Sequence, residues 1–339
     1  MSARWSSFRL WKKSASVNVP DIFSYLVAGL GVCSAERVTH YQISSCYEAS
    51  CLVRDTDAGR NKLVKYKMVV LDIDGTLLDS QQQLRPAVID VVRKTIGRGV
   101  LVTLATGRPF DFASKLASQM GIDIPLILEH GSIIQDSCTA AVLYEDALPN
   151  HLLCGLVHEV VSEGYQPFLC RSPLGNDEIL SGPSAYDNPA YPSNEQHLSI
   201  HRVSYEDLCD VSHVTGVFVF HRQDVLSSLY TRLLSKSTYK LRHRQVKANP
   251  QNIFILEILN GGCSKAQALT YLARTYKVSM NEVLAIGDDH NDLELFDTVG
   301  MSVAMGNAIP AILDRAKAIV GTNDEDGVVE ALNRFVLPI

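Results

Sequence analysis

The sequence lacks any hydrophobic run long enough to cross a lipid bilayer. The apolar stretch at residues 23–33 is too short, because a helical span needs about 20 residues. This stretch also follows Asp21 and lies too far from the start of the chain for an ordinary secretory signal. We therefore predict that no segment spans a membrane and that the partner is not a membrane.

The sequence also lacks an excess of positive charge. Its formal net charge is −6 and its isoelectric point is near 5.9. Proteins that bind the phosphate backbone of DNA or RNA need a basic face, and no nucleic-acid-binding module is visible in this chain. Nucleic acid is therefore not expected as a partner.

Paired cysteine spacings are a third absence. Eight cysteines are scattered along the chain, and no two have the Cys-x-x-Cys spacing of a zinc or redox motif. They are Cys33, Cys46, Cys51, Cys138, Cys154, Cys170, Cys209 and Cys263. We interpret them as reduced thiols of an intracellular protein, and not as zinc ligands or a disulfide framework.

Residues 1–66 differ in composition from the rest of the chain. The first twenty residues contain two arginines and two lysines, five serines and no acidic residue, which is typical of an organelle transit peptide. A disordered extension or a wrongly assigned start codon explains the composition equally well. The predicted location is intracellular and soluble: the cytoplasm, or a plastid or mitochondrial matrix if the segment is a transit peptide.

From residue 67 onward, apolar strand patterns alternate with helical patterns. A length of 339 residues and a hydrophobic content of 46% suggest two domains, or one domain with a large insertion. Alternating strands and helices are typical of a parallel sheet with crossover helices. The strands are predicted at 68–71, 100–105, 125–128, 283–286 and 318–320, and the helices at 85–98, 110–120, 264–276 and 310–316.

Two carboxylates follow the first of these strands. Asp72 lies at its carboxyl end, where ligands bind in open α/β sheets, and Gly75 allows the chain to turn just beyond. Such a pair can divide two tasks: Asp72 attacks phosphorus, while Asp74 protonates the leaving oxygen and later activates water. Taken alone, an Asp-x-Asp pair is more often a solvated turn.

The second strand leads to Thr106, Gly107 and Arg108 at the same edge of the sheet. The Thr106 hydroxyl can donate a hydrogen bond to a phosphoryl oxygen, and Gly107 lets the backbone approach that oxygen. Alternatively, Thr106 caps the next helix. Arg108 is a candidate for contacting phosphate or substrate, and a surface role is equally open.

Residues 133–260 have a different texture and predict an inserted α+β domain. Helices are predicted at 151–162 and 224–235, and strands at 166–170, 214–220, 239–246 and 253–259. The polar run 171–199 is expected to be a long loop, either functional or disordered. Lys240, Arg242 and Arg244 lie two apart on a strand and share a face. That face either binds a second anionic group or protects an edge strand, and the edge interpretation is favoured.

The segment Asp72-Ile73-Asp74-Gly75-Thr76-Leu77-Leu78 resembles the first motif of the haloacid dehalogenase (HAD) superfamily. From about residue 67 to the C-terminus, the chain is similar to the Cof-type small-molecule phosphatases of that superfamily. The resemblance implies a Rossmann-like parallel-sheet α/β core at 67–132 and 261–339. It also implies that residues 133–260 form a C2B cap domain, which closes over the site and selects the leaving group.

The resemblance extends to three later motifs, and Thr106 resembles the second HAD motif. Lys265, at the start of a predicted helix, resembles the third HAD motif, although Ala266 follows it where relatives commonly have glycine. Asp288 and Asp292 follow a buried strand, and Mg²⁺ prefers oxygen ligands such as theirs. The expected metal ligands are Asp72, Asp288 and the backbone carbonyl of Asp74. Asp292 is expected to hold a metal-bound water or to orient Lys265.

Two further residues complete the expected site. Asn291 lies within the Asp288–Asp292 motif and is assigned, together with Thr106, Gly107, Arg108 and Lys265, to binding phosphate or substrate. The segment Glu129-His130-Gly131-Ser132 departs from the Asn-Gly-Ala that Cof-type relatives usually show. His130 therefore either alters the rim of the site or, more commonly for such a histidine, is a hydrogen-bonded structural residue.

These patterns predict a Mg²⁺-dependent phosphatase that acts through an aspartyl-phosphate on Asp72. The expected substrate and partner is a small phosphorylated metabolite, of the sugar phosphate, flavin mononucleotide or pyridoxal phosphate class. A phosphohexomutase-type phosphotransferase and, less favoured, a non-catalytic phosphometabolite-binding protein are the alternatives. The chain is expected to be a monomer or a small homo-oligomer.

Overall fold

The structure is a computed structural model that describes residues 65–172, 178–183, 200–236, 238–245 and 253–337. The chain divides into two units, residues 1–59 and residues 60–339. The first unit lies outside the described residues, and so does almost all of the N-terminal extension at 1–66, for which a transit peptide was one of the interpretations. Among the described helices, none combines the length and the apolar character that a membrane crossing requires.

A five-stranded parallel sheet forms the core of the second unit, in the strand order β14-β13-β12-β1-β2. Its strands are β1 (Met68–Leu71), β2 (Leu101–Leu104), β12 (Val283–Gly287), β13 (Met301–Ala304) and β14 (Ala318–Ile319). Leu71 of β1 pairs with Leu104 of β2 and with Ile286 of β12. The residues that follow these three strands therefore emerge at the same edge of the sheet.

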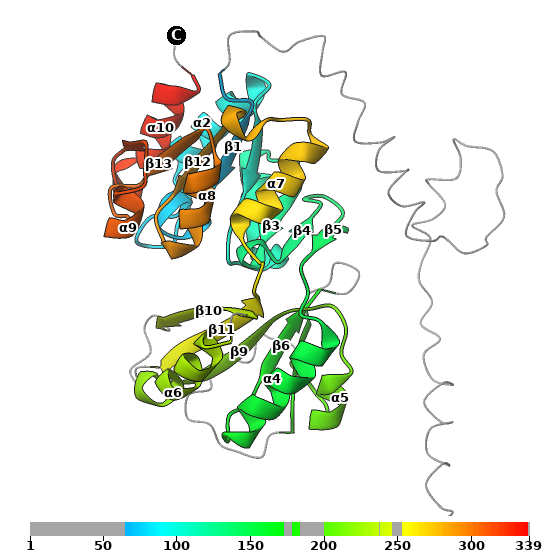
Figure 1. The fold of residues 1–339 in the computed structure, drawn as a ribbon. Coiled ribbons are helices and arrows are strands. Elements are labelled where there is room, and N and C mark those ends of the chain that lie inside the picture. The colour runs from blue at the N-terminus through cyan, green and yellow to red at the C-terminus, as the bar shows by residue number, and fades with distance from the viewer. Residues whose placement is uncertain (1–64, 173–177, 184–199, 237, 246–252, 338–339) are drawn as a thin grey trace, which may run out of the picture. The chain divides into compact units, whose positions relative to one another are not determined.

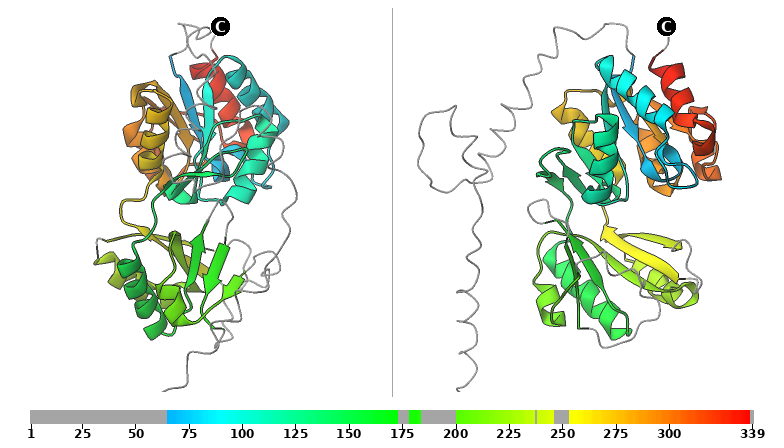
Figure 2. Two further views of the ribbon diagram at one scale, coloured as in Figure 1. Left: turned by 90° about the vertical axis from the view of Figure 1, so that its right-hand side faces the viewer. Right: turned by 180° about the vertical axis from the view of Figure 1, so that it is seen from behind.

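Helices cover both faces of this sheet, because its central strands β1 and β12 are apolar and buried on both sides. Val69 and Leu71 pack toward α2, α3 and α10, whereas Met68 and Val70 pack toward α7, α8 and α9. Figures 1 and 2 show α7 and α10 on opposite sides of the sheet. The helix bounds are α2 (Pro86–Gly97), α3 (Phe110–Met120), α7 (Lys265–Thr275), α8 (Leu293–Thr298), α9 (Pro310–Leu313) and α10 (Gly327–Phe335).

A small antiparallel sheet in the order β3-β4-β5 adjoins the core. Its strands are β3 (Leu126–Leu128), β4 (Ile133–Gln135) and β5 (Val142–Glu145). A bridge between Ala105 and Ile127 links β3 to the end of β2. Ile133 and Ile134 pack into the two core clusters, so the β4–β5 hairpin, which the sequence pattern did not predict, belongs by its packing to the core.

The inserted region, which we call the cap region, is a six-stranded sheet in the order β10-β11-β9-β6-β7-β8. Its strands are β6 (Phe168–Arg171), β7 (Glu178–Ser181), β8 (Ile200–Arg202), β9 (Val214–Arg222), β10 (Tyr239–Gln245) and β11 (Ile253–Asn260). Its helices are α4 (Asn150–Ser162), α5 (Tyr205–Cys209) and α6 (Gln223–Leu234), and they pack on this sheet through one apolar cluster (Figure 1).

The predicted fold class is confirmed: a parallel α/β core is joined to an additional sheet with its own helices. The strand and helix predictions in both parts agree with the structure within a few residues at their ends. Within the polar run 171–199, however, residues 178–181 form strand β7, whose backbone pairs antiparallel with β6. The basic strand predicted at 239–246 was interpreted as an edge strand. This position is confirmed, because β10 lies at the edge of the cap sheet.

Candidate active site

Asp72 stands at the carboxyl edge of the core sheet, directly after β1. Its backbone N–H donates to the Ile286 carbonyl of β12, and the residue is only 5% exposed. Burial raises the pKa of the Asp72 carboxyl well above its ordinary value, and the nearby charge of Asp292 adds to this effect, whereas Lys265 opposes it. A buried carboxyl at this edge costs free energy unless cations compensate it.

Lys265 is the cation that the chain supplies. Its Nζ donates to Asp72 Oδ1 at 2.5 Å and to Asp292 Oδ1 at 2.7 Å, and its side chain is fully buried. Burial alone would lower the pKa of Lys265, but Asp292 and Asp72 outweigh it, so the pKa is raised and the lysine stays charged. A positively charged lysine is unfavourable at a helix N-terminus, where the helix dipole is positive. The carboxylates of Asp72 and Asp292 compensate this repulsion.

Asp288 completes the acidic cluster. The Thr76 hydroxyl donates to its Oδ1 at 3.0 Å. Burial, with the charge of Asp292, raises the pKa of Asp288 to about 7. Gly75 lies beside it with φ +77°, and a Cβ on Gly75 would overlap the Asp288 carboxylate, so only glycine fits this close approach.

The three carboxylates fit a divalent metal. Oxygen atoms of Asp72, Asp288 and Asp292 all lie within 4.8 Å of one another. Carboxylate oxygens are hard ligands, which suit Mg²⁺, Mn²⁺ or Ca²⁺ better than soft metals. Burial first, and the neighbouring aspartates second, raise the pKa values of Asp72 and Asp288. A bound cation would stabilise their ionised forms.

The loop after β2 brings Arg108 to Asp74. Arg108 Nε and NH2 donate to the two Asp74 carboxylate oxygens at 2.8 and 2.6 Å, which is a bidentate ion pair. This hydrogen bonding raises the pKa of the Arg108 guanidinium, although burial opposes it. Arg108 therefore contacts the carboxylate to which acid–base chemistry was assigned. The expected metal contact through the Asp74 backbone carbonyl stays a prediction.

Thr106 and Gly107 lie beside His130. The Thr106 side chain is buried, and its Oγ1 accepts a hydrogen bond from the Arg108 backbone N–H at 3.1 Å. His130 donates its backbone N–H to the Thr106 carbonyl at 2.9 Å. A Cβ on Gly107 would overlap the His130 ring. In this structure Gly107 therefore makes room for an imidazole.

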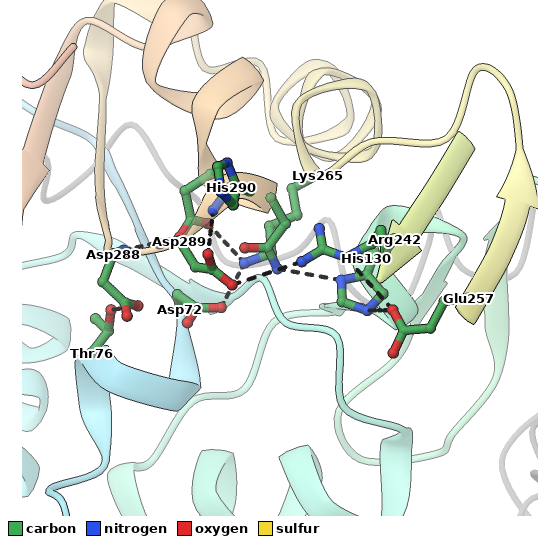
Figure 3. A network of polar contacts seen from close by, with 11 residues as sticks. Asp72, Thr76, His130, Arg242, Glu257, Lys265, Asp288, Asp289 and His290 are labelled. Carbon is green, nitrogen blue, oxygen red and sulfur yellow. Dashed lines mark hydrogen bonds and ion pairs between the residues drawn. The ribbon is translucent and has the colours of Figure 1, made fainter. Parts of the chain in front are cut away.

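His130 joins the core to the cap region (Figure 3). Its Nε2 lies 3.0 Å from Glu257 Oε2 on β11, and its Nδ1 lies 3.3 Å from Asn291 Nδ2. Burial lowers the pKa of His130, although Glu257 opposes this effect. Of the two roles left open for His130, the hydrogen-bonded structural one matches these contacts, and they also place Asn291 next to it.

Cap strand β10 contributes charges to the same region. Arg242 Nε lies 3.6 Å from Glu257 Oε2, and its NH2 lies 3.9 Å from Asp289 Oδ2. Lys240 pairs with Glu294 of α8. The basic face of β10 thus pairs with acidic groups that follow β12, in addition to lying at a sheet edge.

The structure brings the predicted site residues together in two groups. Asp72, Asp288, Asp292 and Lys265 form the carboxylate–lysine cluster, while Asp74 and Arg108 form a neighbouring ion pair. Sequence reasoning missed the contact of Thr76 with Asp288 and the position of Glu257. The signal for Glu257 was available, because it is the one charged residue in an otherwise apolar strand pattern at 253–259, and such a residue needs a partner when buried.

Comparison with known proteins identifies the family. A model of the haloacid dehalogenase-like hydrolases matches residues 69–332. The chain belongs to this family. The resemblance to the HAD superfamily is therefore confirmed, and so is the expectation that the chain is a hydrolase of this superfamily.

Relatives of this HAD-type chain cover most of its length. The 5-amino-6-(5-phospho-D-ribitylamino)uracil phosphatase YitU of Bacillus subtilis (strain 168) is 27% identical over 271 residues, which is 79% of this chain and 97% of the relative. The HMP-PP phosphatase of Serratia proteamaculans (strain 568) is 28% identical over 279 residues, which is 80% of this chain and 96% of the relative. Both names bear out the prediction of a phosphatase-type hydrolase.

A solved structure is similar in fold. The crystal structure of a haloacid dehalogenase-like hydrolase from Bacteroides thetaiotaomicron has a TM-score of 0.63 and 27% sequence identity, and the match covers 79% of this chain and 99% of that one. The HAD fold of the core and the additional cap sheet therefore agree with an experimentally determined relative.

The raised pKa of Asp288 makes a prediction about stability in the absence of metal. Between the ordinary pKa of 3.8 and the folded value of about 7, the folded state holds the proton more tightly, so stability falls as pH rises through this window. Asp288→Asn mimics the protonated form. At pH 8 without metal, we expect it to raise the free energy of unfolding by about 1–2 kcal/mol, after allowing for solvent screening.

Denaturant unfolding at pH 4.5 and pH 8, with EDTA or Mg²⁺, checks this prediction. Asp297→Asn, which removes an exposed carboxylate paired with Arg315 on the surface, is the control and should change stability little at either pH. The interpretation is wrong if Asp288→Asn destabilises the metal-free protein at pH 8.

The buried His130–Glu257 contact predicts measurable coupling between the cap region and the core. A double-mutant cycle with His130→Asn and Glu257→Gln should give a coupling energy of about 1–2 kcal/mol in the free energy of unfolding at pH 7.5, because the Glu257 side chain is only 1% exposed.

The His213–Glu145 pair provides the matched control, since its histidine is 57% exposed. Its cycle should give less than about 1 kcal/mol. Equal coupling energies in the two cycles would mean that burial does not strengthen the His130–Glu257 contact.

Proposed function

We propose that this HAD hydrolase is a Mg²⁺-dependent phosphatase that cleaves a small phosphorylated metabolite through an aspartyl-phosphate on Asp72. The observation that carries the proposal is the buried cluster of three carboxylates around Lys265 at the carboxyl edge of the sheet. With all groups ionised, this cluster has more negative than positive charge. It is therefore built to hold a cation, and a cation is what a phosphate dianion needs there.

Asp72 is the proposed nucleophile. One of its oxygens accepts from Lys265 at 2.5 Å, which orients the carboxylate toward the edge of the sheet and keeps it from rotating freely. Attack forms a bond from Asp72 oxygen to phosphorus while the ester oxygen leaves. Water then cleaves the acyl phosphate, which releases phosphate and regenerates Asp72.

Asp74 is the proposed general acid and base. It would protonate the leaving oxygen in the first step and remove a proton from water in the second. The bidentate contact with Arg108 holds the Asp74 carboxylate in one orientation. Arg108 is also assigned to the substrate phosphate, so the phosphate would compete with Asp74 for the same guanidinium. Thr106, Gly107 and Asn291 are proposed to line the phosphate position.

Mg²⁺ is the proposed metal because the available donors are carboxylate oxygens. Asp72, Asp288 and the Asp74 backbone carbonyl would bind it, with Asp292 supporting Lys265. When bound, the ion would neutralise charge on the phosphoryl oxygens and so reduce the repulsion that Asp72 meets.

The proposed substrate class remains a small phosphate ester. The relatives named above support it, because one is named for a phosphorylated ribityl compound attached to a uracil ring. The contact of Lys240 and Arg242 with the core supports a cap region that lies over the leaving group and selects it by shape.

We further propose the domain boundaries. Residues 67–132 and 261–339 form the core and residues 133–260 the insertion, as the sequence suggested, with one adjustment. The apolar cluster of the cap region begins at Leu148, whereas Ile133 and Ile134 pack with the core. We therefore place the start of the folded cap near Leu148.

Phosphate release from a panel of phosphorylated metabolites tests the function. The panel includes hexose phosphates, flavin mononucleotide, pyridoxal phosphate and the phosphorylated ribitylaminouracil. We expect one compound to be hydrolysed fastest, with activity lost in EDTA and in Asp72→Asn. Asp79→Asn is the control, because the hydrogen bonds of the Asp79 side chain, among the described residues, go to backbone N–H groups of the following turn. Conversion of a hexose 1-phosphate to its isomer would instead identify a mutase, and binding without turnover would indicate a non-catalytic protein.

The assignment of Asp74 makes a separate prediction. Asp74→Asn should lower kcat by about 10²–10⁴-fold on an alkyl phosphate, whose leaving oxygen needs a proton. The loss in the phosphorylation step should be much smaller with 4-nitrophenyl phosphate, whose leaving group departs without one. A burst of nitrophenol followed by slow turnover is expected, because water attack still lacks its base. An equal loss on both substrates without a burst contradicts the role.

A further inference from the structure

A second cluster of metal-ligating side chains lies in the cap region, on elements that do not contribute to the carboxylate–lysine cluster. Cys154 and His158 of α4 and Cys209 of α5 each offer one ligand atom, and these atoms lie within 4.8 Å of one another. Cys209 Sγ is 3.9 Å from His158 Nε2. None of the roles proposed above uses these residues.

The local structure brings these three groups together. Cys154 and His158 are four residues apart on a helix of 13 residues, so they share one face. Leu208 is fully buried in the cap core and anchors α5. The Ser204 side chain caps this short helix by accepting the Asp207 backbone N–H at 3.0 Å. The position of Cys209 beside α4 is therefore determined by packing and capping.

The spacing suits a tetrahedral metal. With metal–sulfur bonds of about 2.3 Å and metal–nitrogen bonds of about 2.0 Å, tetrahedral angles place a sulfur and a nitrogen ligand about 3.6 Å apart. The observed 3.9 Å between Cys209 Sγ and His158 Nε2 needs only a few tenths of an ångström of closure. Because all three ligand atoms lie within 4.8 Å of one another, adjustments of the side chains can close the remaining gaps.

The donor chemistry selects the kind of metal. Two thiolates and one imidazole favour Zn²⁺ or another thiophilic ion over Mg²⁺, which prefers oxygen. Both cysteines are partly buried and His158 is exposed, so an ion can enter from solvent and a water can complete the coordination. The alternative is that Cys154 and Cys209 only fill space in the cap region. Two thiols would do so equally well without the His158 nitrogen beside them.

We propose, in contrast to the expectation from cysteine spacing that no cysteine is a zinc ligand, that Cys154, His158 and Cys209 form a Zn²⁺ site that connects α5 to α4 in the cap region. Zn²⁺ binding displaces the thiol protons and joins two segments that are 51 residues apart in the sequence. The bound ion therefore stabilises the cap region independently of the catalytic centre.

Binding of Co²⁺ to the reduced full-length protein tests this site. Thiolate ligands give Co²⁺ a charge-transfer absorption that carboxylates do not, so the Asp72 cluster cannot produce it. We expect one equivalent of Co²⁺ to give this absorption, Zn²⁺ to abolish it by displacement, and Zn²⁺ to raise the thermal unfolding temperature. Cys209→Ser should remove the absorption, whereas Cys170→Ser, a partly buried cysteine on β6, should leave it unchanged.

His158→Gln keeps the test decisive if a cysteine variant fails to fold, because His158 is exposed and its replacement should not disturb packing. It should weaken Zn²⁺ binding at least tenfold, while His201→Gln, at an exposed position on β8, should not. The proposal is overturned by the absence of a thiolate absorption in wild type, by its persistence in Cys209→Ser, or by recovery of a Cys154–Cys209 disulfide from reduced protein in place of metal binding.

Discussion

Repulsion among buried carboxylates is the constraint on which the rest of the active site depends. Asp72, Asp288 and Asp292 meet at one edge of the sheet, and Lys265 contacts two of them. Separating such charges from water is costly, so each must be matched by a cation or take up a proton. The pKa values of Asp72 and Asp288 are raised because burial makes their ionised forms costly. A divalent cation bound by these carboxylates would relieve this cost.

The architecture brings these charges together. Parallel strands end at one edge, so residues that follow β1 and β12 become neighbours although more than two hundred positions separate them in the chain. Helix α7 then directs Lys265 into the cluster, with Ser264 capping its N-terminus. Backbone freedom matters where atoms approach most closely, as at Gly75, where any side chain would displace Asp288.

The cap region is coupled to this site through buried polar groups. Glu257 lies on a cap strand and contacts both His130 and Arg242, while His130 also contacts Asn291. A buried carboxylate is expensive when unpaired, so these partners are required wherever Glu257 remains ionised. The departure of His130 from the usual family pattern is therefore accompanied by compensating contacts from the cap region and by Gly107, which makes room for the ring.

The sequence by itself determined the α/β class, many of the strands and helices, and the candidates Asp72, Asp74, Lys265 and Asp288, because apolar periodicity and short motifs are local properties of the chain. Only the tertiary structure decided that the β4–β5 hairpin packs with the core, that Arg108 forms a bidentate ion pair with Asp74, and that Glu257 contacts His130. It also decided that Cys209 lies beside α4. Each of these contacts joins segments whose spacing carries no periodic signal, so they depend on how the sheets and helices pack.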